Sequence, residues 1–255
     1  MTNTLKTHKE ILIKNKPQFL WFITLAFSMT IAISNWYDAR IIELFGFAVS
    51  PGALIFPVTL LLSDIITEVY GYKQARRAIW AAFIFNFIFI LYGQLVAILP
   101  SPAFATDNEA FNKLIQMNGR IIAASLISYL ISEPLNSYLM SRAKMISKGE
   151  YIGFRFVLST VVSSFFDSLL FIPIAFYGIF PNEQLLHMIF NIWVIKISIE
   201  IGLLPFSIRA TTWLKEKEEL DIYDFGTNFS PFSLDAEYKS ENNLYNSSNK
   251  DTKHE

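Results

Sequence analysis

Long runs without charged residues alternate with short charged segments over most of this chain. Three runs contain no charged residue, and they cover 19–37, 44–63 and 78–106. Three more are nearly free of charge, and they cover 121–141, 156–182 and 184–208. A bilayer core about 30 Å thick is crossed by about 20 helical residues, so each run is long enough to span a membrane. The pattern predicts six transmembrane helices, over 19–37, 44–63, 78–100, 121–141, 156–180 and 185–208.

One apolar run alone would also fit a buried helix of a soluble protein. Six in sequence, with short polar links and no amphipathic alternation, argue against that interpretation. No strand-length alternating pattern recurs, which argues against an outer-membrane barrel. The first run follows four lysines, as in a signal peptide, but it is longer than a typical signal core and lacks a small-residue cleavage site. The predicted fold class is therefore all-α, a polytopic membrane protein with six helices in a compact bundle.

Basic residues alternate in number from one connecting segment to the next. The segments before the first run, after the second, after the fourth and just after the sixth hold 4, 3, 4 and 3 of them. The segments after the first, third and fifth runs hold 1, 2 and 0. Lysine and arginine accumulate in cytoplasmic loops. We therefore expect both termini to lie in the cytoplasm.

The composition agrees with a membrane protein and excludes several other classes. The chain is 53% hydrophobic and 17% charged, against about 25% charged in typical globular domains. The net charge of −1 excludes a nucleic-acid binder that works by bulk positive charge. The absence of cysteine excludes a disulfide framework, a thiolate metal site and a cysteine nucleophile. Since the three histidines are scattered and no Walker or Rossmann motif is present, we expect no metal, no cofactor and no enzyme activity.

The last 41 residues differ from the rest of the chain. From Lys215 onward they hold 15 charged side chains, with a net charge of −5 and many Asn and Ser. This composition predicts an acidic cytoplasmic tail, 215–255, that is largely disordered. Two apolar islands in it, 221–225 and 229–232, are candidates for docking on the membrane domain. The remaining parts are then a cytoplasmic segment, 1–17, and the transmembrane domain, 18–214.

Charged residues inside the predicted spans are costly to insert, so they indicate a site. Asp64 and Glu68 are four residues apart on one face of the second helix, and two such carboxylates repel unless a cation lies between them. The alternative is that both lie at the membrane surface and pair with Lys73, Arg76 or Arg77. Asp167 is a lone carboxylate in the middle of the fifth span and needs a partner.

The sixth span carries both Lys196 and Glu200, four residues apart. They can pair with each other, or Lys196 can neutralise Asp167 and leave Glu200 free for a ligand. Trp193 is three residues before Lys196 and is a candidate for stacking on a ring, and Asn35 adds an amide in the first span. Glu133 lies in the fourth span, before a proline. The candidate substrate-binding residues are Asn35, Asp64, Glu68, Asp167, Trp193, Lys196 and Glu200.

Convergent carboxylates, amides and aromatic rings favour a small, flat, polar ligand. A purine-like ring offers faces to Phe and Trp, and its amidine edge offers two N–H donors to one carboxylate. Asp and Glu accept hydrogen bonds from the exocyclic amino groups of bases for the same reason.

The second-span block of residues 63–77, Ser-Asp-Ile-Ile-Thr-Glu-Val-Tyr-Gly-Tyr-Lys-Gln-Ala-Arg-Arg, resembles the signature of the queuosine precursor transporter family. These are bacterial six-span inner-membrane proteins that are also catalogued as vitamin uptake transporters. Further similarities are Ser34-Asn35, Gly52, Phe56-Pro57, Arg120, Ala124-Ser125-Leu126, Arg155, Ser159-Thr160, Asp167-Ser168, Lys196 and Pro205, so the resemblance covers about residues 20–225. It implies uptake of 7-deazaguanine precursors of queuosine (the 7-cyano and 7-aminomethyl forms, or queuine) for tRNA modification. The family roles carry over to Asp64, Asp167 and Lys196.

Three other functions stay open from the sequence. The chain could be the substrate-binding subunit of an energy-coupling vitamin importer, but the small residues of the first span form only a weak docking face for an ATPase module. It could be an intramembrane enzyme, although no metal motif and no nucleophile–base pair is present. It could also be a structural or assembly protein, for which neutralising Asp167 would harm folding as much as any activity.

The sequence also leaves open whether the chain forms a homo-oligomer. Transport by proton coupling through Asp64, Glu68 or Glu200 and facilitated diffusion are equally compatible with it.

Overall fold

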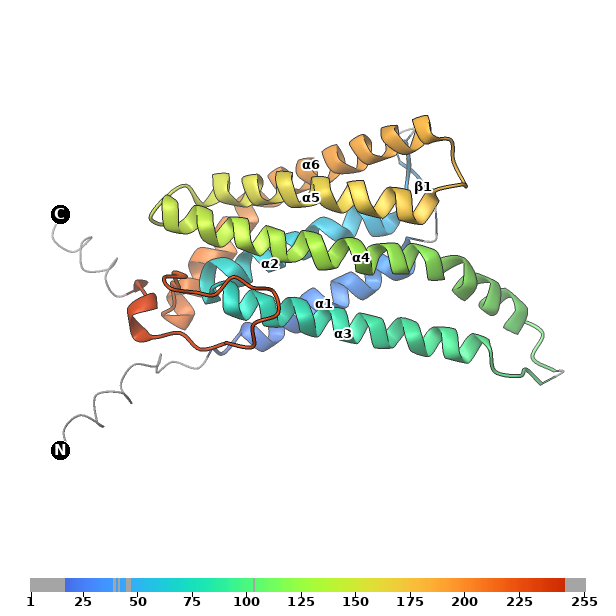
Figure 1. Ribbon diagram of the computed structural model, residues 1–255, viewed down its shortest axis with the longest axis horizontal. Helices are drawn as coiled ribbons and strands as arrows, with labels where there is room; N and C mark the ends of the chain where they lie inside the picture. The colour runs from blue at the N-terminus through green and yellow to red at the C-terminus, as the bar shows by residue number, and fades with distance from the viewer. Residues whose placement is uncertain (1–16, 39, 41, 45–46, 103, 246–255) are drawn as a thin grey trace.

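Six long helices make up the body of the molecule in the computed structural model, which describes residues 17–245 except 39, 41, 45–46 and 103 (Figure 1). They are α1 (Leu20–Tyr37), α2 (Pro51–Tyr70), α3 (Tyr72–Ala97), α4 (Asn108–Ile146), α5 (Ile152–Phe176) and α6 (Asn182–Glu218). In this part of the chain each of the 6 helices is long and apolar enough to cross a membrane. The protein is a multi-pass membrane protein, as the charge pattern predicted. Residues 1–16 of the predicted cytoplasmic segment 1–17, and the last ten residues, 246–255, lie outside the described residues.

Helix α2 is the central helix of the bundle. It packs against α1, α3, α4 and α6, and 72% of its apolar window is buried, a larger share than in the other five helices. The side chain of Ser50 caps its first turn, and Pro51 occupies the first helical position, where no backbone N–H is required. The helix therefore begins later than the charge-free run and continues past Asp64 to Tyr70. Absence of charge marks residues that tolerate hydrocarbon, whereas the cap marks where the helix starts.

The two ends of the bundle are different. At one end, β1 (Ile42–Leu44) and β2 (Phe47–Val49) form a short antiparallel hairpin between α1 and α2. The turn between α5 and α6 lies at this same end, which we call the hairpin end (Figure 1). At the other end α6 finishes and the chain folds back over the helices, and we call it the tail end.

The segment that follows α6 packs onto the tail end through residues 219–245, which include a single 3-10 turn, η1 (Ser240–Asn242). Asp224 accepts hydrogen bonds from the backbone N–H of Tyr72 at 3.1 Å and from Ser141 Oγ at 2.6 Å. The rings of Phe229 and Tyr72 lie 5.0 Å apart, and Trp80 donates to the carbonyl of Pro231 at 2.7 Å. Both apolar islands of the predicted tail therefore dock on the helices. The expectation of a largely disordered tail does not hold for residues 219–245.

Gly71 makes the tight turn between α2 and α3 and lies directly under this segment. Its φ of +81° falls in the region that favours glycine, and a Cβ at this position would lie 2.5 Å from the hydroxyl oxygen of Tyr238. Tyr238 donates to Asp224 and accepts from the backbone N–H of Lys73 at 2.9 Å. The absence of a side chain at Gly71 thus lets the tail close onto the helix ends.

Candidate functional site

A cavity of about 140 Å³ lies inside the bundle, toward the hairpin end. It has room for roughly ten water-sized spheres, which is enough for a small heterocycle. Five helices contribute to its wall. The polar and charged residues of the lining are Ser34, Asp38, Ser50, Ser125, Ser128, Asp167, Asn191 and Lys196. The aromatic residues are Phe56, Phe171 and Phe176.

An ion pair between Asp167 of α5 and Lys196 of α6 lies in the wall of the cavity. The Lys196 ammonium donates to Asp167 Oδ2, and both residues are only 4% exposed. Ser132 Oγ donates to the other carboxylate oxygen at 3.3 Å. The ammonium also lies 4.4 Å from the centre of the Phe56 ring, a favourable cation–π position. Of the two pairings open from the sequence, the structure thus shows Lys196 with Asp167 and not with Glu200.

The part of the cavity nearest the hairpin end is built by the end of α1 and the start of α2. Ser50 Oγ donates to Asp38 Oδ1 at 2.5 Å, and Ser34 Oγ donates to the carbonyl of Gly52 at 3.0 Å. A Cβ on Gly52 would lie 2.2 Å from Asp38 Oδ1, so only glycine allows the two helices to approach this closely. Burial raises the pKa of Asp38 to about 6, despite the opposing effect of the Ser50 hydrogen bond. The sequence gives no signal for Asp38, because it directly follows the first charge-free run, where a carboxylate is typical of a solvated loop.

Two predicted residues lie behind the cavity wall. Asn35 is buried and accepts a hydrogen bond from Ser125 Oγ at 2.6 Å, while its amide nitrogen has no partner among the described residues. Asp64 accepts from the amide of Asn136 at 2.7 Å, and that amide in turn accepts from Ser163 Oγ at 3.0 Å. Asn35 therefore touches the lining through Ser125, whereas Asp64 lies deeper in the bundle.

Trp193 occupies a different place from the one predicted. Its indole N–H donates to the carbonyl of Val161 at 2.9 Å, and its ring packs edge-on against Phe165 and Phe190. It joins α5 to α6 and is not part of the cavity lining. Phe171 and Phe176 offer aromatic faces to the cavity instead.

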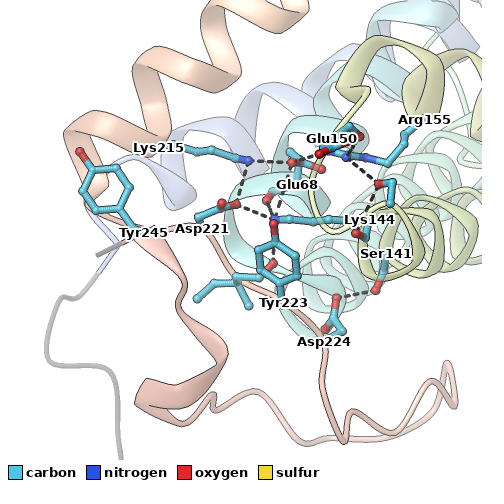
Figure 2. A network of polar contacts seen from close by, with 12 residues as sticks. Glu68, Ser141, Lys144, Glu150, Arg155, Lys215, Asp221, Tyr223, Asp224 and Tyr245 are labelled. Carbon is cyan, nitrogen blue, oxygen red and sulfur yellow. Dashed lines mark hydrogen bonds and ion pairs between the residues drawn. The ribbon is translucent and has the colours of Figure 1, made fainter. Parts of the chain in front are cut away.

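Glu68 lies at the tail end, at the centre of a network of cations (Figure 2). Its Oε1 is 2.7 Å from Arg155 Nη2, 2.7 Å from Lys215 Nζ and 3.7 Å from Lys144 Nζ. The cations come from three helices, α5, α6 and α4. Glu68 is completely buried, so this network holds α2 to those helices at the tail end. The sequence had offered Lys73, Arg76 or Arg77 as its partners.

Asp221 of the tail completes this network. It contacts Lys144 and Lys215, each at 2.7 Å. Burial alone would raise the pKa of Asp221, but these two ammonium groups outweigh it and hold the pKa below its ordinary value. The tail is thus fixed by charge as well as by the apolar islands.

These observations define a class of protein. Helices that span a membrane surround a largely apolar cavity with an ion pair in its wall, and an ion-pair network together with a packed tail covers the opposite end of the bundle. Such a cavity is typical of a membrane protein that binds a small solute inside its helix bundle.

Comparison with known proteins identifies the family. Residues 50–210 match the family described as "Putative vitamin uptake transporter", and the chain belongs to it. The matched region contains Asp64, Asp167 and Lys196. The chain is 27% identical over 201 residues to the "Probable queuosine precursor transporter" of Bacillus subtilis (strain 168), an alignment that covers 77% of this chain and 86% of the relative. It is 26% identical over 161 residues to the "Queuosine precursor transporter" of Escherichia coli (strain K12), which covers 62% of this chain and 69% of that relative. No solved structure gives a significant match.

Proposed function

We propose that this protein transports precursors of queuosine into the cell across the bacterial inner membrane. The carrying observation is the cavity with the Asp167–Lys196 pair in its wall, found in a chain whose curated relatives bear the name queuosine precursor transporter. The substrates are 7-deazaguanines, namely the 7-cyano and 7-aminomethyl forms or queuine. The chain acts as a carrier and not as an enzyme, and it works without an ATPase module.

The cavity supplies the contacts that such a ring needs. A flat heterocycle can lie against Phe171 and Phe176, which both line the cavity and meet each other edge-on with ring centres 6.1 Å apart, and it gains from aromatic contact there. Asp167 can accept hydrogen bonds from the amidine edge of the ring, while Lys196 compensates the charge of the carboxylate. The amide nitrogen of Asn35, which has no partner among the described residues, supplies a donor beside Ser125 for the carbonyl oxygen of the 7-deazaguanine.

The orientation follows from the positive-inside pattern. The tail end, which carries the basic segments, faces the cytoplasm, and the hairpin end faces outward. A solute arriving from outside then meets the cavity first, and the Glu68 network lies beyond it. Asp64 and Glu200 lie between the cavity and the Glu68 network and are not part of the cavity lining. Glu68 serves to close the tail end, and Trp193 serves to join α5 and α6.

Uptake of a labelled 7-deazaguanine tests the proposal, in cells that lack both their own precursor synthesis and their own transporter. Queuosine in tRNA provides a second measurement. The double variant Asp167→Asn/Lys196→Met removes both charges, so neither is left unpaired in the protein interior. We expect its uptake to fall about tenfold to a hundredfold, the value of one or two charge-assisted hydrogen bonds. Ser198→Ala is the matched control, because this exposed hydroxyl bonds only to its own helix.

Three results would overturn the proposal. The first is that cells with the wild-type protein take up none of the three compounds (the 7-cyano form, the 7-aminomethyl form and queuine) faster than cells without it. The double variant could transport as well as wild type, which would remove the ion pair from the binding site. An ATPase module could copurify with the protein and be required for uptake, in which case the chain would be a subunit of an energy-coupling importer.

A further inference from the structure

Three carboxyl groups lie between the cavity and the Glu68 network, and they belong to neither. They are Asp64 on α2, Glu133 on α4 and Glu200 on α6, and each is completely buried. Along α2, Asp64 follows Phe56 of the cavity by eight residues and precedes Glu68 by four. At 1.5 Å per residue these separations are about 12 Å and about 6 Å along the helix. Glu133 and Glu200 lie within electrostatic reach of Asp64, so the three acids form a layer across the bundle, which we call the acid layer.

Most oxygen atoms of the acid layer have no hydrogen-bond partner. Asp64 Oδ1 accepts from Asn136, but Asp64 Oδ2 has no partner within the described residues, and the same holds for both oxygens of Glu133 and of Glu200. Buried polar atoms in proteins are almost always hydrogen-bonded. Five such oxygens on three helices mark carboxyl groups whose negative charge no hydrogen bond from the described residues stabilises.

The charged groups around the acid layer are already paired with others. Asp64 lies within electrostatic reach of Glu200, Glu133 and Glu68. The groups that face Glu133 are Ser63, Asp167, Lys196 and Tyr129. Ser63 Oγ lies 3.3 Å from Ser137 Oγ, Tyr129 donates to the carbonyl of Ile79, and Lys196 is bound to Asp167. Lys144, Arg155 and Lys215 contact Glu68 at the tail end. Lys196 is the cation that reaches Glu133, and it is already bound to Asp167, so within the described residues the acid layer has no counter-ion of its own.

Three ionised carboxylates without partners would be very costly in this environment. Moving one such ion from water into a low-dielectric interior costs several kcal/mol even after relaxation. A bound metal ion would be one remedy, but no group of acidic or histidine side chains in the described residues converges on a metal position. A proton needs no coordination shell, and it neutralises each carboxyl group individually.

We propose that Asp64, Glu133 and Glu200 bind and release the protons whose downhill flow drives substrate import. This step rests on the proposed function, since it concerns the energy source of the same transport. In the conformation described here the tail end is closed and the carboxyl groups of the acid layer carry protons. When the path to the tail end admits water, a carboxyl group loses its O–H proton to water and becomes a hydrated carboxylate. It takes up a proton again from the outer side before the next substrate enters.

Proteoliposomes that contain the full-length protein test this coupling. The probe is labelled 7-cyano-7-deazaguanine, which carries no ammonium group of its own, and a trapped pH dye reports proton entry. With one pH unit across the membrane, acid outside, one coupled proton supports about tenfold accumulation. We expect wild type to accumulate the probe and to acidify the lumen in step with it. We expect Asp64→Asn, Glu133→Gln and Glu200→Gln to bring the probe only to equal concentrations, because amides cannot carry the proton.

Counterflow without a pH gradient separates the two proposals. It measures exchange of labelled for unlabelled substrate and needs no driving force, so the amide variants are expected to retain it. Retained counterflow also shows that these variants are folded. We expect them to fold because each amide has the shape of the carboxyl group that it replaces and carries no charge. If wild type performs counterflow but never accumulates the probe, the coupling is overturned while transport stands. If every amide variant accumulates the probe as wild type does, or a sodium gradient replaces the pH gradient, the acid layer is not the proton site. If wild type shows no counterflow of any 7-deazaguanine, the proposed function itself fails.

Discussion

Replacing Glu68 by glutamine removes the only negative charge that α2 contributes to the tail-end network. The substitution keeps the shape of the side chain, so its effect reports the charge. Arg155 loses its carboxylate and is left with neutral partners, among them Ser147 Oγ and the carbonyl of Glu150. Lys144 and Lys215 keep Asp221, at 2.7 Å each. The main consequence is thus an unpaired guanidinium that is 1% exposed.

The expected loss of stability follows from that single uncompensated cation. Removing one partner of a buried ion pair costs about 3–5 kcal/mol, because the remaining charge stays buried without compensation. Since Asp221 still serves both lysines, we expect the lower part of that range, about 3 kcal/mol. For a chain of this length about 1 kcal/mol corresponds to a Tm change of about 2–4 °C, so Glu68→Gln should lower the Tm by roughly 6–12 °C.

Thermal unfolding of the purified protein in detergent measures this shift. Glu241→Gln is the matched control, because Glu241 forms an exposed pair with Lys239 at 3.6 Å and should leave the Tm unchanged. The double variant Glu68→Gln/Arg155→Met removes both charges and should recover most of the Tm. If Glu68→Gln melts with wild type, the network does not hold the tail end together. If the two single losses simply add in the double variant, Glu68 and Arg155 are not coupled.

Three further perturbations test other parts of the molecule. Because burial raises the pKa of Asp38 to about 6, this carboxyl group should be ionised above pH 6 and protonated below it. Equilibrium binding of the cationic 7-aminomethyl form should therefore weaken as pH falls through 6, and in Asp38→Asn this pH dependence should disappear. Gly52→Ala places a Cβ 2.2 Å from a carboxylate oxygen of Asp38 and should abolish uptake, whereas Gly202→Ala meets nothing within 4 Å and should transport normally. Tyr238→Phe loses two hydrogen bonds under the tail and should make the tail more sensitive to limited proteolysis, whereas Tyr92→Phe, at an exposed position, should not.

The helices were predictable because their cause is local. A run of about 20 residues without charge reports hydrocarbon tolerance directly, and the six runs correspond to the six long helices. The ends were less predictable. Helix α2 begins at Pro51 because of a cap at Ser50, and α4 extends over 39 residues, well beyond its apolar run. Charged residues at such helix ends are solvated or paired, so the helix can continue through them. A hydropathy pattern therefore does not predict where the helix ends.

The tail shows how composition can mislead. Few apolar residues and many charges are typical of disorder, because such a segment buries too little surface to offset its conformational entropy. Residues 219–245 fold because the helix ends supply the missing partners. Arg76, only 3% exposed, donates to the carbonyls of Asn228, Ser230 and Asp235. Those partners lie 152 or more residues away in the sequence, so no local pattern contains them.

Trp193 shows the same limit within one helix. Its distance of three residues from Lys196 suggested a shared face, but three residues turn an α-helix by about 300° and leave the side chains about 60° apart. That difference is enough to direct Lys196 to the cavity wall and Trp193 to the contact with α5. The aromatic residues that do line the cavity, Phe171 and Phe176, lie in a helix rich in phenylalanine, where the sequence alone does not distinguish them.

Asp64 and Glu68 look equivalent in the sequence, yet the fold gives them opposite surroundings. Four residues bring them to nearly the same face of α2 but separate them by about 6 Å along its axis. Glu68, nearer the tail end, contacts three cations, which lie 76, 87 and 147 residues further along the chain. Asp64, nearer the hairpin end, accepts a hydrogen bond from one amide and lies within electrostatic reach of two further acids, Glu133 and Glu200. No cation in the described residues pairs with it. The surroundings of each carboxyl group therefore depend on which side chains the neighbouring helices place beside it. For this reason the same motif contributes one acid to the ion-pair network of the tail end and another to the interior of the bundle.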